Sequence, residues 1–177
     1  MAEFNKNLWA PWRMDFIRSL HDEQGDRGCF LCRYWETPED DRANHVLWRG
    51  AGAFVVMNRF PYANGHLLIA PRSHCGDLAG VPESELTAMT LMTRDALAVL
   101  RRAVNPAGFN VGMNIGHGAG AGLPEHVHTH VVPRWAGDTN YMAVMTDTRI
   151  IPQSLDELYG ELIAAGAKLG LPARDKP

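Results

Sequence analysis

Three histidines separated by single residues, in the run HVHTH at 126–130, restrict the folding of this 177-residue chain more than any other feature. Successive side chains of a β-strand point to opposite faces, so in a strand the three imidazoles emerge on one face and the valine and threonine on the other. The run therefore predicts a strand over residues 126–135 (HVHTHVVPRW). One structural histidine is common, but three in a row require a chemical explanation.

Three interpretations of His126, His128 and His130 are open from the residues alone. The imidazoles could be structural, they could bind zinc as three ligands with a fourth position open, or one could act as a nucleophile. An imidazole nitrogen is a competent nucleophile toward phosphorus when a hydrogen bond to the other nitrogen fixes the tautomer. The preceding loop GHGAGAG at 116–122 favours the nucleophile, because glycines let backbone N–H groups approach an anion.

The remaining pattern predicts an α+β fold. Apolar runs at 45–49, 53–58 and 66–71 are separated by glycine-containing turns, which is typical of an antiparallel meander. Apolar residues at three- and four-residue intervals predict a long helix over 83–103 and a short C-terminal helix over 155–165. Strands in succession around one long helix indicate a sheet with helices mainly on one face.

Alternation after the long helix predicts a further strand, with Asn114 on its open polar face. Its buried face is expected to carry Phe109, Val111, Met113 and Ile115. The aromatic-rich residues 1–44 show no sustained period, so they are expected to form an irregular segment wrapped around the core. We expect one domain over 1–177, with a core at 45–135 and a C-terminal extension at 136–177.

Cys29 and Cys32 form a Cys-x-x-Cys pair in a chain with an odd number of cysteines, three. Such a pair suits metal or redox chemistry better than a secreted disulfide framework. Two thiolates need two more ligands for a closed tetrahedral zinc site, and His74 and His126 are the best candidates. Buried reduced thiols and a redox pair are the alternatives. Cys75 is expected to be buried and inert.

The other histidines are given no part in the chemistry. His66 opens an apolar run and His45 opens another, and both are expected to be structural. His117 is expected to be a solvated loop residue, with an extra phosphate donor as the alternative.

Charge and hydropathy exclude two classes of partner. The formal net charge is −3, from 17 basic and 20 acidic residues, so non-specific nucleic-acid binding lacks its electrostatic basis. No apolar stretch approaches the roughly 18 residues of a membrane span, and the start MAEFNKN lacks the apolar region of a secretory signal. We therefore expect a cytoplasmic protein that binds neither membrane nor nucleic acid.

The chain resembles the histidine triad (HIT) family of nucleotide hydrolases and transferases, in its fragile-histidine-triad-like branch. The resemblance covers most of the chain and rests on HVHTHVVPR at 126–134, NRFP at 58–61 and NGHLLIAP at 64–71. LWAPWRM at 8–14 and GFNVGMN at 108–114 resemble more specifically the bacterial dinucleoside tetraphosphate phosphorylases. The resemblance to the HIT family implies a HIT-like fold: an antiparallel half-barrel sheet with one long helix and a short C-terminal helix. It also implies a homodimer.

The resemblance also implies a reaction. His128 would attack the α-phosphate of a dinucleoside polyphosphate, such as diadenosine tetraphosphate, to form a nucleotidyl-histidine that phosphate or water resolves. His130 would contact the same phosphate, Asn58 would hold ribose hydroxyls, and Asn114 would lie near the scissile phosphate. Hydrolysis of nucleoside phosphoramidates, a regulatory nucleotide-binding protein with little turnover, and a zinc hydrolase are the alternatives.

Backbone N–H groups of Gly120, Gly122 and Leu123 are expected to contact phosphate. Many relatives have Gln followed by Ser or Thr where this chain has Gly122 and Leu123, so side-chain help to the leaving group is missing there. In several members of the family a Cys pair, a distant His and the first triad His hold structural zinc, which implies zinc on the Cys-x-x-Cys pair here. No organic cofactor is expected. Phe54 or Phe60 is expected to stack on the base.

Overall fold

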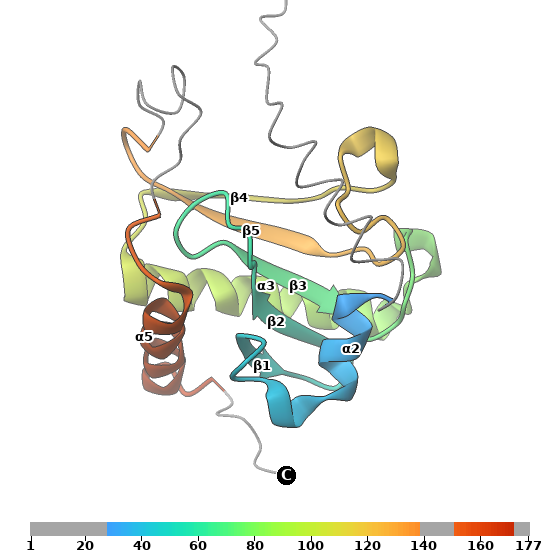
Figure 1. The fold of residues 1–177 in the computed structure, drawn as a ribbon, viewed down its shortest axis with the longest axis horizontal. Coiled ribbons are helices and arrows are strands. Elements are labelled where there is room, and N and C mark those ends of the chain that lie inside the picture. Colours follow the sequence, from blue (N-terminus) through green and yellow to red (C-terminus); the bar gives the residue numbers. More distant parts are fainter. Residues whose placement is uncertain (1–27, 139–150, 172–177) are drawn as a thin grey trace, which may run out of the picture.

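A computed structural model describes residues 28–138 and 151–171 of the chain. A five-stranded antiparallel sheet with the strand order β1-β2-β3-β5-β4 lies at its centre (Figure 1). The strands are β1 (Val46–Arg49), β2 (Ala53–Met57), β3 (Leu67–Pro71), β4 (Gly108–Met113) and β5 (Thr129–Arg134). The helices are α2 (Phe30–Glu36), α3 (Glu83–Val104) and α5 (Leu155–Lys168), with short 3-10 turns η1 (Pro38–Asp40), η2 (Leu78–Gly80) and η3 (His117–Ala119). This is the predicted α+β fold.

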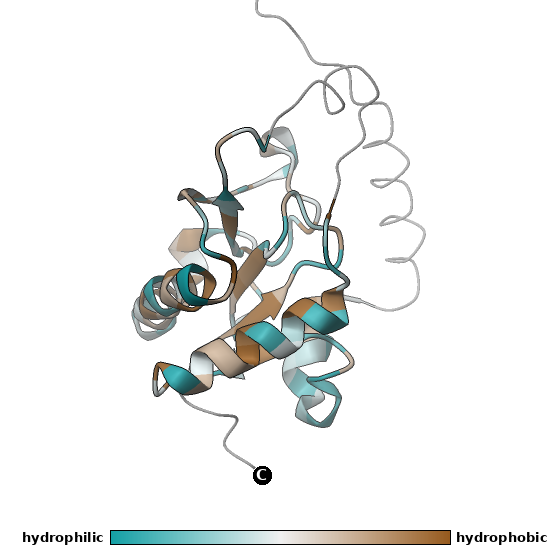
Figure 2. Cartoon of the chain, turned by 90° about the vertical axis from the view of Figure 1, so that its left-hand side faces the viewer, coloured by the Kyte–Doolittle hydropathy of each residue, from teal (hydrophilic) through white to brown (hydrophobic). Residues whose placement is uncertain are grey.

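Both faces of the central strands are buried, which explains why their sequences are continuous apolar runs. Leu67 and Ile69 of β3 belong to a core with residues of α3 and α5, whereas Leu68 and Ala70 belong to a second cluster with Leu31 of α2. Strands at the centre of the molecule are accordingly brown, that is hydrophobic, in Figure 2. The sheet thus has α3 and α5 on one face and α2 on the face that carries the histidines.

The long helix is confirmed almost to the residue. α3 buries the stripe Met89, Met92, Ala96, Val99 and Leu100 against the sheet. Acidic residues occupy its first turn and basic residues its last, which suits the helix dipole. Asn105, in the left-handed conformation (φ 44°), ends it.

The predicted C-terminal helix is also present and is bound to β1. The Tyr159 hydroxyl donates to the Val46 carbonyl (3.1 Å), and His45 Nε2 lies 3.1 Å from Asp156 Oδ1. Ser154 caps the helix by accepting from the Glu157 N–H. His45 is therefore structural, as expected.

The prediction for the strand over 109–115 is wrong in part. Val111 and Ile115 are 48% and 39% exposed, although both were placed on the buried face. The strand lies at the edge of the sheet. Phe109 and Met113 are partly buried against the core that includes α3, as predicted, whereas Val111 and Ile115 are not part of this core. It ends at Met113, so Asn114 lies beyond it.

Two further boundaries differ from the sequence prediction. Residues 30–36 form α2 rather than irregular structure, because a seven-residue helix is too short to show a helical period. The β5 ladder begins at Thr129 rather than at residue 126, because the Val127 N–H donates to the Cys75 carbonyl (2.7 Å) instead of to a neighbouring strand. The segment LWAPWRM lies outside the described residues. None of the described helices is long and apolar enough to cross a membrane.

Candidate active site and metal centre

His128 is buried and held by one hydrogen bond. Its Nδ1 lies 2.8 Å from the carbonyl oxygen of His126, which can only accept. Nδ1 therefore carries the proton, and Nε2 of the neutral ring carries a free lone pair. Burial lowers the pKa of His128, with the bond to the His126 carbonyl as a smaller opposing effect. His128 thus has the tautomer and the charge state of a nucleophile.

A second chain of hydrogen bonds fixes the tautomer of His130. Nδ1 of His66 accepts from the backbone N–H of Tyr62 (3.1 Å) and lies 3.2 Å from Asn58 Nδ2. Nε2 of His66 must then carry the proton, and it donates to Nδ1 of His130 (2.9 Å). The remaining nitrogen of His130, Nε2, is consequently an N–H donor. We call this chain, Tyr62 N–H to His66 to His130, the imidazole relay.

His130, the last member of the relay, is neutral at neutral pH. Burial, and second the neighbouring His128, lower the pKa of His130 to about 4. The rings of His128 and His130 lie 4.8 Å apart, so protonation of either opposes protonation of the other. At neutral pH the site therefore offers one free imidazole nitrogen and one neutral N–H donor side by side.

This pKa makes stability depend on pH in a definite window. An unfolded chain binds a proton at His130 below pH 6.5, but the folded chain does so only near pH 4, so folding is progressively opposed as pH falls between these values. We expect the melting temperature to fall over pH 6.5 to 4, and to fall less steeply in His130→Asn. Calorimetry of both proteins across this range measures the two slopes. Equal slopes would show that His130 titrates normally in the folded protein.

Sequence reasoning missed the part of His66 in the site. It was expected to be structural, yet it is 1% exposed and contacts His130 directly. The pairing of β3 with β5, which places Leu68 opposite His130, is what brings His66 there. That strand order could not be derived from periodicity, although the histidine that opens the run HLLIAP was a visible signal.

Asn58 lies at the same site, in the turn after β2. Its Oδ1 accepts from the Phe60 N–H (3.0 Å) and its Nδ2 faces His66. These contacts hold the β2–β3 turn and the relay in place. The expected contact of Asn58 with ribose hydroxyls remains a prediction.

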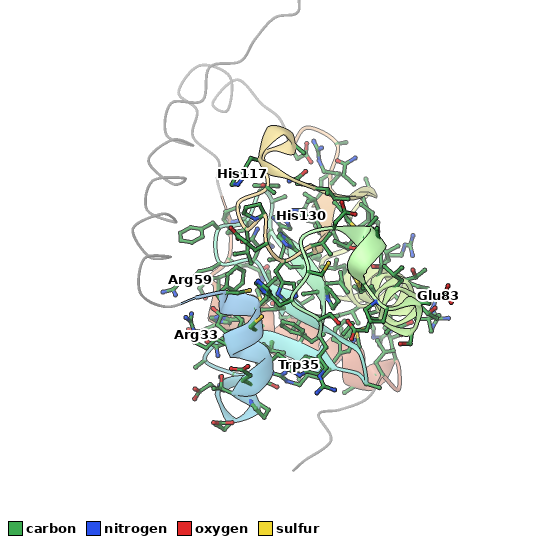
Figure 3. All side chains as sticks on the ribbon, turned by 90° about the vertical axis from the view of Figure 1, so that its right-hand side faces the viewer. Arg33, Trp35, Arg59, Glu83, His117 and His130 are labelled. Carbon is green, nitrogen blue, oxygen red and sulfur yellow. The ribbon has the colours of Figure 1, made fainter. Side chains whose placement is uncertain are left out.

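The glycine loop lies on the same side of the molecule as the histidines, as His117 and His130 show in Figure 3. Gly116 (φ 76°) and Gly120 (φ 77°) adopt positive φ angles around η3, so the loop requires glycine at both positions. His117 is exposed, as expected for a solvated loop residue, and its part as an extra phosphate donor remains the untested alternative. Leu123 is 6% exposed and its side chain packs in the cluster with Leu31, so only its backbone can serve a phosphate.

The four predicted metal ligands meet at one place. The donor atoms of Cys29, Cys32, His74 and His126 all lie within 4.8 Å of one another. Nδ1 of His126 is 3.2 Å from Cys29 Sγ and 3.5 Å from Cys32 Sγ, and Cys32 Sγ is 3.3 Å from His74 Nδ1. Tetrahedral zinc holds sulfur and nitrogen ligands about 3.6 Å apart, from bond lengths of roughly 2.3 and 2.05 Å. The donor set and its spacing therefore fit zinc.

The tautomer of His126 also fits a metal. Its Nε2 lies 3.0 Å from the carbonyl oxygen of Pro71 and must donate to it, which leaves the Nδ1 lone pair directed at the cysteines. Burial raises the pKa of Cys32 to about 12, so its thiol must lose a proton when a metal binds. Cys75 takes no part, because its thiol donates to the Asp77 carbonyl (3.0 Å).

A buried ion pair orients the helix that carries the cysteines. Arg49 of β1 pairs with Asp41, which is 4% exposed, and also donates to the carbonyl of Trp35 (3.2 Å) at the end of α2. The guanidinium lies 5.5 Å from the ring centroids of both Trp35 and Phe54. Arg49 thereby ties the C-terminal end of α2 to the sheet.

Buried imidazoles of fixed tautomer on the face of an antiparallel sheet are what the resemblance to histidine triad proteins implies, and the comparisons with known proteins agree. The family model described as the HIT domain matches residues 41–137, more than half of the chain. A Mycobacterium tuberculosis protein named AP-4-A phosphorylase is 33% identical over 153 residues, which are 85% of this chain and 78% of that protein. The chain belongs to the HIT family.

Solved structures agree on the fold. A Zn-bound histidine triad family protein from Mycobacterium smegmatis has a TM-score of 0.65 and 25% identity, over 81% of this chain and 96% of that one. A histidine triad nucleotide-binding protein from Sulfolobus tokodaii also has a TM-score of 0.65, with 20% identity, over 80% of this chain and 93% of that one. The predicted HIT-like fold is therefore confirmed.

Proposed function

We propose that the protein transfers a nucleotidyl group from a dinucleoside polyphosphate, with diadenosine tetraphosphate as the favoured substrate and phosphate as the favoured acceptor. The observation that carries this proposal is the bond from His128 Nδ1 to the His126 carbonyl, which leaves a neutral nucleophilic Nε2. The resemblance to the Mycobacterium tuberculosis AP-4-A phosphorylase supports the choice of substrate and acceptor.

The reaction has two displacements at the α-phosphorus. In the first, His128 Nε2 forms a bond to phosphorus while the bridging P–O bond breaks, and its electron pair leaves on the departing nucleoside polyphosphate. In the second, an oxygen of phosphate or water forms a new P–O bond and the P–N bond breaks, which returns the electron pair to Nε2. With diadenosine tetraphosphate and phosphate the products are ATP and ADP, and with water they are ATP and AMP.

Donors around the α-phosphate would stabilise charge on its oxygens. The neutral Nε2–H of His130, whose tautomer the relay fixes, is proposed to donate to these oxygens, and backbone N–H groups of Gly120, Gly122 and Leu123 are proposed to add to it. Asn114, half-buried at the start of the loop, is proposed to lie near the scissile bond. These groups are neutral, so none is an acid ready to protonate a leaving amine, whereas a nucleoside polyphosphate can depart as an anion without taking up a proton.

The proposed place for the base is the surface above the sheet face that carries the relay, because the apolar side chains of that face, Val56 and Leu68, are themselves buried (1% and 4% exposed). Val56 pairs with Leu68 and Leu68 pairs with His130, so the three side chains share one face of the sheet. Partly buried Phe30 and Tyr34 of α2 border this surface. Phe54 was expected to stack on a base, but it is 0% exposed and cannot do so. Phe60, 51% exposed, keeps that expectation as a prediction.

The metal is proposed to be structural zinc held by Cys29, Cys32, His74 and His126. Four protein ligands close a tetrahedral site, so zinc would supply rigidity rather than an activated water. Both ring nitrogens of His126 have partners, Nδ1 at the cysteines and Nε2 at the Pro71 carbonyl, which supports a Cys-and-His site over a three-histidine zinc site. A homodimer is also proposed, from the family resemblance.

The test incubates the purified protein with diadenosine tetraphosphate, with and without inorganic phosphate, and resolves AMP, ADP and ATP by chromatography. We expect ADP and ATP only when phosphate is present. AMP and ATP in both reactions would show that water, rather than phosphate, is the acceptor. No product from this substrate, together with rapid hydrolysis of an adenosine phosphoramidate, would contradict the proposed substrate class.

A further inference from the structure

The ring of Tyr62 covers the imidazole relay. Its centroid lies 4.5 Å from that of His66 and 5.8 Å from that of His130, and it is nearly parallel to the His130 ring (21°). The backbone N–H of the same residue donates to His66 Nδ1. One residue therefore contacts the relay twice, once at its first hydrogen bond and once across both rings.

The position of Tyr62 is unlike that of a core aromatic residue. Its side chain is 38% exposed, whereas His66 beneath it is 1% exposed. The ring thus lies between solvent and the bond from His66 Nε2 to His130 Nδ1. Water that reached this bond could donate to Nδ1 of His130 in place of His66, and could stabilise a protonated imidazole.

The other neighbours of His130 in the described part of the chain are two imidazole rings and two uncharged strand residues. Within residues 28–138 and 151–171, the titratable groups whose rings contact it are His128, His66 and Tyr62 itself. The neighbouring strands place Leu68 of β3 and Gly112 of β4 opposite it, and neither side chain carries a charge. On the side of β4, the residue opposite His130 is Gly112, which has no side chain to exclude water from the imidazole.

We propose that Tyr62 is a positioning residue, whose backbone N–H sets the tautomer of His66 and whose ring keeps water from the His66–His130 bond. Together they present Nε2–H of His130 as a neutral donor to the substrate phosphate. Only this last consequence rests on the proposed function. The state of the relay itself can be measured without any substrate.

The test compares Tyr62→Phe, which keeps the ring, with Tyr62→Ala, which removes it. Nuclear magnetic resonance of protein labelled with ¹⁵N-histidine reports the tautomer and the pKa of each ring, and the His130 signals are assigned by their loss in His130→Asn. In Tyr62→Phe we expect the wild-type tautomers and a pKa for His130 near 4. In Tyr62→Ala we expect this pKa to rise toward the ordinary 6.5.

Kinetics then separate positioning from substrate binding. We expect kcat of Tyr62→Ala to fall about tenfold with little change in KM, and Tyr62→Phe to restore it. An unchanged His130 tautomer and pKa in Tyr62→Ala would overturn the proposal, and so would a rise in KM alone, which would make the ring a substrate contact. Tyr62→Leu replaces Tyr62→Ala if the smaller side chain prevents folding. Absence of any nucleotidyl transfer would contradict the proposed function and leave the resonance result as the test of Tyr62.

Discussion

Replacement of His128 by asparagine is expected to lower kcat by about 10⁴-fold or more, because it removes the only nitrogen proposed to bond to phosphorus. Nucleotide affinity should change little, since the relay and the glycine loop remain. Single-turnover kinetics measure the first effect, and calorimetric titration with a non-hydrolysable dinucleoside polyphosphate measures the second.

The matched control is His117→Ala. This histidine lies close in sequence but is exposed on η3, so its loss should leave both quantities near the wild-type values. Substantial activity in His128→Asn would contradict a covalent mechanism. A large loss in His117→Ala would show that the solvated loop residue donates to phosphate.

Replacement of Cys29 by serine is expected to remove the bound metal and to destabilise the fold. The thiol contacts His126 Nδ1, so its loss opens the ligand set and releases the ring that precedes the nucleophile by two residues. Loss of a structural zinc ligand should cost about 3 kcal/mol or more. For a chain of this size that corresponds to a fall in melting temperature of about 10 °C. Elemental analysis and calorimetry provide the two measurements.

Cys75→Ser is the matched control for this variant. Its thiol donates a hydrogen bond to the Asp77 carbonyl and is not one of the four clustered ligands. The metal content should therefore be unchanged. Equal metal content and melting temperature in Cys29→Ser and wild type would contradict the structural-metal proposal. Activity per folded molecule should fall less than stability does, because His128 keeps its bond to the His126 carbonyl.

The features predicted well are those in which local pattern and tertiary packing demand the same structure. The apolar stripe of α3 predicts a helix and is buried in the structure. The apolar runs of β2 and β3 predict buried strands, and all five residues of each strand are buried. The four candidate metal ligands could be grouped because a Cys-x-x-Cys pair needs two more ligands for zinc, and because the family resemblance implies a distant histidine and the first triad histidine as those ligands. Their meeting at one place depends on contacts that no pattern encodes, such as Val127 N–H to the Cys75 carbonyl.

The features missed depend on which strands become neighbours. His66 looked isolated because β5, its partner across the sheet, follows more than sixty residues later. Val111 has the right period for burial, but it lies on the edge strand and outside the core cluster, so it is exposed. Leu31 and its neighbours form a helix because Arg49 and the apolar cluster hold them, rather than because their own propensity requires it.

The most direct test of the covalent mechanism is the mass of the protein during turnover. Wild-type protein mixed with diadenosine tetraphosphate without phosphate is quenched in alkali, where a phosphorus–nitrogen bond to histidine survives, and digested for mass spectrometry. The mechanism predicts an adenylyl adduct on the peptide that contains His128, at its Nε2, which disappears when phosphate is added and never forms in His128→Asn. Steady turnover with no adduct, or an adduct on a different residue, would contradict it.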